Sequence, residues 1–71
     1  METIKLRETD EFIKLGQALK KAGLESSGVD AKMDIQSGLV KVNGEVEERR
    51  GRKLYDGDVF EFNGKQVKVE K

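Results

Sequence analysis

Cysteine and histidine are both absent from this 71-residue chain. Without cysteine there is no disulfide framework and no thiolate ligand for a metal. Without histidine, the commonest zinc ligand and general base is missing. We therefore expect no metal, no other cofactor and no small-molecule substrate, and a non-catalytic module of the cytoplasm fits the composition best.

Long apolar runs and an excess of charge are lacking too. No stretch approaches the roughly 20 residues of a membrane span, and residues 1–5 have no signal-peptide core, so we expect no membrane partner. The 14 basic and 14 acidic residues give a formal net charge of zero. Because bulk attraction to nucleic acid needs a net positive charge, any such binding must come from a local patch.

The length predicts one domain, spanning residues 1–71, with a thin core, because a chain this short buries only about 60% of its unfolded surface. Charged residues make up 39% of the chain and hydrophobic residues 35%. The apolar residues recur periodically instead of being scattered, which predicts a folded chain.

A first helix is predicted by apolar residues at helical spacing. They are Phe12, Leu15, Leu19 and Ala22. We expect Thr9 or Asp10 to cap its start and Gly23 to end it. Lys20 and Lys21 suit the negative end of its dipole.

The opposite face of this helix is polar. Its members are Lys14, Gln17 and Lys21. On spacing alone such a stripe is most often a solvated face. Gly16 lies beside the apolar stripe, where glycine costs about 1 kcal/mol relative to alanine, and we interpret it as allowing close approach of a second helix.

The second helix is predicted to begin at Ser27 and to end at Gly38. Ser27 and Asp30 have the spacing of a capping box, in which each satisfies a backbone amide near the other. Ala31 and Ile35 define its buried side.

Three other residues of this helix need an interpretation. Asp34 lies near the buried side, and we expect it at the rim of the core, with its carboxylate in water or paired with a lysine. Val29 and Met33 face away from Ala31. Our interpretation is that they cover a neighbouring loop, and the alternative is a small exposed apolar patch.

Alternating apolar residues and turn signals predict strands near residues 3–7, 39–42, 45–48, 59–62 and 65–69. Asn43-Gly44 and Asn63-Gly64 suit type I′ turns, since both central positions need positive φ. In the third strand only Val46 is expected to point inward. The order β-α-α-β-β-β-β predicts an α+β fold with two N-terminal helices packed on a small twisted antiparallel sheet.

A basic run, Arg49-Arg50-Gly51-Arg52-Lys53, follows the third strand. The simplest interpretation is a solvated loop balanced by Glu45, Glu47 and Glu48 on the preceding strand. A second is a protein-interaction adaptor whose basic loop docks on an acidic surface, with Val29 and Met33 as an apolar anchor.

Catalysis is the weakest hypothesis for this chain. The carboxylate pairs Glu47 with Glu48 and Asp56 with Asp58 fall on a surface strand and a turn, without a nucleophile or base nearby. We therefore predict that the protein is not an enzyme.

Several residues together resemble the signature of the S4 RNA-binding domain. They are Leu15, Gly23-Leu24, Ser26-Ser27, Ala31, Ile35, Gly38, Val40-Lys41-Val42-Asn43-Gly44 and Gly57-Asp58. The resemblance spans about residues 12–62 and is closest to the small stand-alone bacterial members. It implies an S4-like fold with the alpha-L RNA-binding motif, and binding of structured RNA, ribosomal or transfer, with a ribosomal particle as a further partner.

The resemblance, with the chemistry of the side chains, implies a set of RNA-binding residues. They are Lys14, Gln17, Ser27, Gly28, Lys32, Lys41, Asn43, Arg49, Arg50, Arg52 and Lys53. Gly28 stands where the family often has arginine, so one phosphate contact is missing, but the helix amides there stay open to a phosphate.

Aromatic residues are few, and most are expected to be buried. Recognition by phosphate position and shape is therefore expected instead of base stacking.

Overall fold

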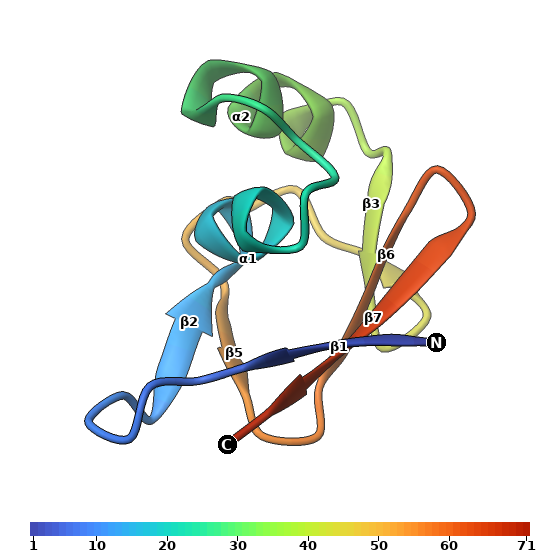
Figure 1. Cartoon of the computed structure of the whole chain (residues 1–71). Helices are drawn as coiled ribbons and strands as arrows, with labels where there is room; N and C mark the ends of the chain where they lie inside the picture. The colour runs from blue at the N-terminus through green and yellow to red at the C-terminus, as the bar shows by residue number, and fades with distance from the viewer.

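The computed structural model describes all 71 residues (Figure 1). In chain order the elements are β1 (Glu2–Lys5), β2 (Phe12–Lys14), α1 (Leu15–Lys21), α2 (Gly28–Gln36), β3 (Val40–Val42), β4 (Glu45–Val46), β5 (Lys53–Tyr55), β6 (Val59–Phe62) and β7 (Lys65–Glu70). Neither helix is long and apolar enough to cross a bilayer. The predicted α+β class is confirmed, and β2 and β5 are strands that the predicted order lacked.

The strands form a five-stranded sheet, in the order β1-β7-β6-β3-β4, and a separate two-stranded ribbon of β2 and β5. The pairs β3–β4, β3–β6 and β6–β7 are antiparallel, as expected. β1 lies at an edge but runs parallel to β7, so the sheet is mixed and not purely antiparallel as expected. Figure 1 shows α1 between α2 and the ribbon, at one end of the molecule.

One apolar cluster holds these layers together. It consists of Ile4, Leu6, Leu15, Ala18, Leu19, Ala31, Ile35, Val40, Val42, Leu54, Phe60, Phe62, Val67 and Val69. Both helices and both sheets contribute to it, so burial of these side chains fixes the position of the helices against the strands.

The start of the first helix was predicted wrongly. Phe12 belongs to β2, which pairs with β5, and α1 begins only at Leu15. Neither Thr9 nor Asp10 caps it, and the N-cap residue, Lys14, makes no side-chain cap bond. Sequence spacing could not show this, because the groups that accept from the first amides of α1 come from a distant loop, described below.

The ends of the helices otherwise follow the sequence signals. The Ser27 hydroxyl accepts from the Asp30 amide at 3.1 Å, although the Asp30 carboxylate makes no return hydrogen bond. After each helix, at Gly23 (φ 75°) and Gly38 (φ 79°), the chain turns left-handed in a Schellman ending. Asn43 and Asn63 have φ of 51° and 53°, which confirms both predicted turns.

Two predictions about burial were wrong. Val46, expected inward, is 55% exposed, whereas its neighbour Glu47 is buried. The strand is only two residues long, so the period-two pattern ends before Glu47 and its side chain turns under the chain. Val29 and Met33 are 68% and 60% exposed, so they form an open apolar patch and cover no loop.

Asp34 is partly buried at the rim of the core, as expected, but its neighbour is a carboxyl and not a lysine. Burial raises the pKa of Glu25 to about 7, and the Asp34 carboxyl beside it and the charge of Asp30 add to this. One Glu25 oxygen, Oε2, is buried and has no hydrogen-bond partner. Glu25, Asp30 and Asp34 therefore form an acidic cluster on this flank of α2.

Glu25→Gln is expected to change how stability depends on pH. Between pH 4.5 and about 7 the folded protein keeps a proton on Glu25 that the unfolded chain releases, so wild-type stability falls as pH rises through this window. The variant lacks this loss and should be about 1–2 kcal/mol more stable at pH 8, and equally stable at pH 4. Urea unfolding at both pH values measures the difference.

Glu8→Gln, which removes an exposed loop carboxylate, is the control and should keep the wild-type pH profile. A Glu25→Gln variant with the wild-type profile would contradict the assignment of the Glu25 pKa.

Candidate nucleic-acid interface

The basic run is folded around one buried carboxylate, that of Glu47. Glu47 Oε2 accepts from the Arg49 amide at 3.1 Å and from Arg49 Nε at 3.0 Å, and Oε1 accepts from Arg49 Nη2 at 3.0 Å and from Arg52 Nη1 at 2.8 Å. The Glu47 amide donates to the carbonyl of Val40 on β3 at 3.0 Å. The loop is thus bound through Glu47 to the central sheet.

The charge of Glu47 is strongly stabilised by these contacts. Hydrogen bonds from Arg49 and Arg52 lower the pKa of the Glu47 carboxyl to about 2, against the opposing effect of its burial. The sequence had placed Glu47 on a surface strand, which was wrong. The predicted balance between this acid and the basic run holds for Arg49 and Arg52 only, because these form the two ion pairs of the structure.

The backbone of the same loop caps α1. The carbonyl of Arg52 accepts from the Leu15 amide at 2.9 Å, and that of Arg50 accepts from the Gly16 amide at 3.0 Å. A Cβ added to Gly16 would lie 3.7 Å from both the Cβ and the carbonyl oxygen of Arg50. Gly16 therefore lies against the basic loop, and the interpretation that it meets the second helix was wrong.

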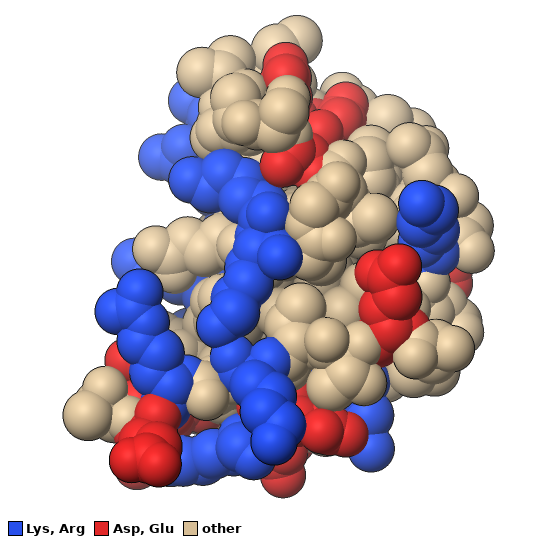
Figure 2. Space-filling model, in the orientation of Figure 1, with Lys and Arg blue, Asp and Glu red and all other residues tan.

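A hollow of about 300 Å³ lies where α1, the basic loop and the start of α2 meet. None of its seven lining residues is hydrophobic: they are Lys14, Gly16, Gln17, Lys20, Gly28, Arg50 and Gly51. We call this the cationic hollow. Figure 2 shows Lys and Arg atoms gathered over α1 and the ribbon, with acidic atoms beside α2 and along the lower edge.

The start of α2 opens toward this hollow. Ser27 Oγ satisfies only the Asp30 amide, and the amides of Gly28 and Val29 donate to no group of the protein. A methyl group on Gly28 would lie 3.8 Å from Lys20 Nζ, so the Lys20 ammonium and these amides share one small region. Positive charge and open helix amides together suit a phosphate.

The structure brings together only part of the predicted set. Lys14, Gln17, Gly28 and Arg50 line the cationic hollow. A second hollow, of about 600 Å³, is lined by Arg49, Gly51, Arg52, Lys53 and Tyr55, and we call it the arginine hollow. On α2, Ser27 precedes Gly28 and the exposed Lys32 follows it by one turn.

Lys41 and Asn43 line neither hollow. Lys41 is exposed on β3, in the central sheet. The Asn43 side chain connects two turns: its Nδ2 donates to Asp58 Oδ1 at 3.1 Å, and its Oδ1 accepts from the Val59 amide at 3.0 Å. The structure thus gives Asn43 a role in joining β3 to β6.

Three residues of this region were not predicted from the sequence as part of the site: Lys20, Glu47 and Tyr55. Lys20 had been assigned to the helix dipole, yet it stands four residues after Gly16 and three after Gln17, a spacing that places all three on one face. Glu47 carried no such signal, because its burial depends on where the short β4 ends.

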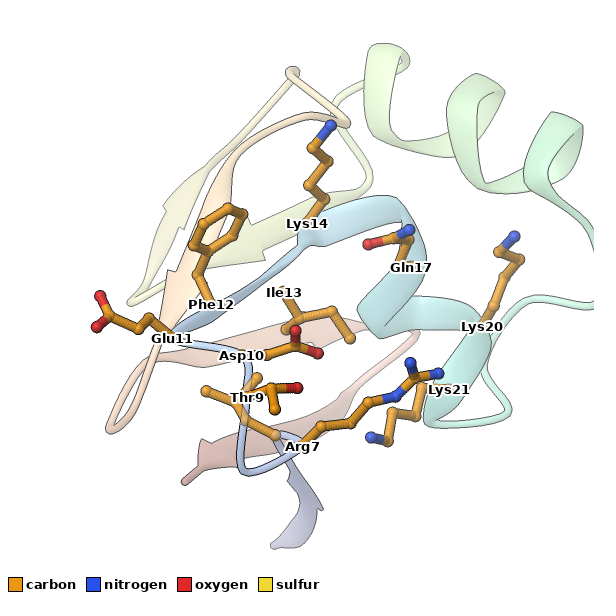
Figure 3. A pocket seen from close by; sticks show the side chains of 11 residues that line it. Arg7, Thr9, Asp10, Glu11, Phe12, Ile13, Lys14, Gln17, Lys20 and Lys21 are labelled. Carbon is orange, nitrogen blue, oxygen red and sulfur yellow. The ribbon is translucent and has the colours of Figure 1, made fainter.

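The largest of the three hollows adjoins the cationic hollow, between α1 and the loop before β2, and its volume is about 940 Å³ (Figure 3). It shares Lys14, Gln17 and Lys20 with the cationic hollow, but Asp10 and Glu11 also line it. Lys21 donates a hydrogen bond to the carbonyl of Lys5 and so joins α1 to β1. Mixed charge makes this hollow a weaker site for a polyanion than the cationic hollow.

These features define a small α+β domain whose charged face is built from two helices and one loop. The sequence pattern of the S4 domain family matches residues 4–70, and the chain belongs to that family. The resemblance seen in the sequence is therefore confirmed.

Relatives of known name agree with this. The chain is 52% identical over 54 residues to a probable ribosome maturation protein, RlbA, of Bacillus subtilis, which covers 76% of each chain. It is 40% identical over 57 residues to a putative RNA-binding protein, YbcJ, of Escherichia coli, over 80% of this chain and 81% of that protein.

The fold is similar to the solution structure of E. coli YbcJ, with a TM-score of 0.73 at 37% identity, over 100% of this chain and 89% of that one. That structure is described as revealing an alpha-L motif involved in RNA binding.

Glu47→Gln is expected to destabilise the protein by about 2 kcal/mol at pH 7, because it removes a charge bound by two guanidinium groups. The lowered pKa means that the stabilisation is present above pH 4.5 and is lost as pH falls toward about 2. Urea unfolding between pH 7 and pH 2 should therefore show the gap between variant and wild type closing with acid.

Glu48→Gln changes the neighbouring exposed carboxylate, which makes no ion pair, and serves as the control. Equal stability of Glu47→Gln and Glu48→Gln at pH 7 would show that the loop does not depend on Glu47.

Proposed function

We propose that this protein is a non-catalytic RNA-binding domain that recognises structured ribosomal RNA during maturation of the ribosome, in the cytoplasm. The observation that carries the proposal is the cationic hollow, in which Lys14, Lys20 and Arg50 meet the open amides of α2. None of these three cationic side chains forms an ion pair with an acidic residue.

The chemistry of the hollow favours phosphate. Arg50 offers a planar fork of donors, and lysine ammonium groups attract phosphate as point charges. With Gly28, no side chain stands between an approaching phosphate and the helix amides. A fixed set of phosphate contacts recognises the shape of a folded RNA, since the backbone positions differ between shapes while the charges do not.

The names of the relatives support the choice of RNA. The B. subtilis relative is named as a probable ribosome maturation protein, and the E. coli relative as a putative RNA-binding protein. Ribosomal RNA is therefore proposed ahead of transfer RNA. Crosslinking in living cells followed by sequencing of the bound RNA should recover ribosomal RNA, whereas recovery of mainly transfer RNA would replace that choice.

One observation favours a second candidate, a protein-interaction adaptor: Val29 and Met33 are exposed on α2. In that case affinity should depend on this apolar patch and little on salt. An RNA binder should instead lose affinity steeply with salt, by roughly 0.7–0.9 log units per log of salt for each phosphate contact.

The triple variant Lys14→Ala, Lys20→Ala and Arg50→Ala is expected to weaken binding to ribosomal RNA by more than tenfold and to lower the salt slope by about 2–3. Arg52 is left in place because it holds Glu47, so the loop should keep its fold. Filter binding over a range of salt concentrations measures both effects.

The control is a second triple variant, Lys65→Ala, Lys68→Ala and Lys71→Ala, which removes the same amount of positive charge. These three lysines are exposed, lie near the C-terminus and line none of the hollows described above. Equal losses in the two triple variants would mean that net charge, and not the cationic hollow, determines affinity.

A further inference from the structure

The β2–β5 ribbon presents an ordered outer face. In its register Phe12 is opposite Tyr55 and Lys14 is opposite Lys53, while the pair between them, Ile13 and Leu54, alternates to the other side. Figure 3 shows Phe12 and Lys14 pointing to one side of β2 and Ile13 pointing to the other. The outer face thus carries one aromatic pair beside one lysine pair.

The two rings are in contact and a cation lies over one of them. The Phe12 and Tyr55 centroids are 5.8 Å apart at an interplanar angle of 51°, and Lys53 Nζ is 4.8 Å from the Phe12 centroid. Yet Tyr55 is 48% exposed. Phe12, with Lys53 over its own ring, therefore packs against one side of the Tyr55 ring, and about half of the Tyr55 residue remains open to solvent.

The backbone at Tyr55 is fixed by a turn. The Tyr55 amide donates to Asp58 Oδ2 at 2.8 Å, and the Asp58 amide donates back to the Tyr55 carbonyl at 3.0 Å. Because the backbone at Tyr55 is already constrained, stacking of a flat group on the ring costs little conformational entropy.

Tyr55 is also the one aromatic residue of the arginine hollow, with Arg49, Arg52 and Lys53 around it. Glu47 holds both guanidinium groups in place, yet the Arg49 side chain is still 74% exposed. A flat apolar group next to an anion matches this surface, and a nucleotide has both, in its base and its phosphate.

We propose that Tyr55, supported by Phe12, stacks an unpaired base of the bound RNA, while Lys53 and the arginine hollow hold the adjacent phosphate. The inference rests on the proposed function and deepens it, because it adds a preference for RNA with an unstacked nucleotide beside its helix. The sequence argued against stacking because most aromatics were expected in the core. That holds for Phe60 and Phe62, which are buried, but not for this pair.

The chain offers a direct probe, since Tyr55 is its one tyrosine and it has no tryptophan. Three hairpin RNAs are compared: one fully paired, one with a single bulged adenosine in the stem, and one with an abasic site at the bulge. Tyrosine fluorescence and affinity are recorded for each. The bulged hairpin should quench Tyr55 and bind about 5- to 150-fold more tightly than the other two.

Tyr55→Phe keeps the ring and Tyr55→Leu removes it, and Tyr55 is exposed enough to tolerate either change. We expect Tyr55→Phe to keep the preference for the bulge and Tyr55→Leu to lose it. Both variants should bind the fully paired hairpin as the wild type does and keep its circular dichroism spectrum, which shows that the fold and the phosphate contacts are intact.

Equal affinity of the wild type for all three hairpins, with unchanged fluorescence, would overturn the stacking proposal and leave the proposed function standing. Absence of binding to every hairpin and to ribosomal RNA would overturn both.

Discussion

The buried carboxylate of Glu47 is the constraint on which the charged face depends. The backbone amide of Glu47 donates a hydrogen bond to β3, and the two carboxylate oxygens accept hydrogen bonds from Arg49 and Arg52. The loop so formed turns the carbonyls of Arg50 and Arg52 toward the first amides of α1. One acid therefore links the central sheet, the basic loop and the first helix.

This arrangement explains how a chain of zero net charge can present a cationic surface. Glu25, Asp30 and Asp34 gather on one flank of α2, where burial and then the two neighbouring acids raise the pKa of Glu25. Glu47 is buried under the loop and pairs with two arginines, so that this trio keeps one net positive charge. Lys14, Lys20 and Arg50, which line the cationic hollow beside α1, have no acidic partner. They lie next to the two amides at the start of α2 that donate no hydrogen bond within the protein. The fold places the acidic and the basic side chains on different parts of the surface, and the amino-acid composition alone does not indicate this separation.

Much of the fold could be predicted because its signals are local. The cap at Ser27, the left-handed glycines after both helices and the two Asn-Gly turns each need only a few neighbouring residues. The start of α1 could not be predicted, because its cap is made by carbonyls about 35 residues further along the chain. For the same reason the residues of β2 were wrongly predicted as helix: the partner strand, β5, begins at Lys53, about 40 residues further along the chain.

The candidate site could be predicted in part. Lys14, Gln17, Gly28 and Arg50 were proposed as RNA contacts and lie together, because spacing on a helix and resemblance to a family both depend on sequence order. Lys20 and the pair Phe12–Tyr55 were not predicted as part of the site. Lys20 matters because of the face of α1 on which it lies, and the two aromatic residues matter because they are opposite each other in the β2–β5 ribbon. The inward turn of Glu47 follows from where a two-residue strand ends, which no pattern in the sequence indicates.

We propose that the RNA binds to one face of the protein, the face organised by Glu47. Mass-spectrometric footprinting of lysine acetylation, with and without ribosomal RNA, measures which face the RNA covers. RNA should protect Lys14, Lys20 and Lys53 and leave Lys65 and Lys68 as reactive as in the free protein. Uniform protection of all lysines, or protection confined to Lys65 and Lys68, would contradict it.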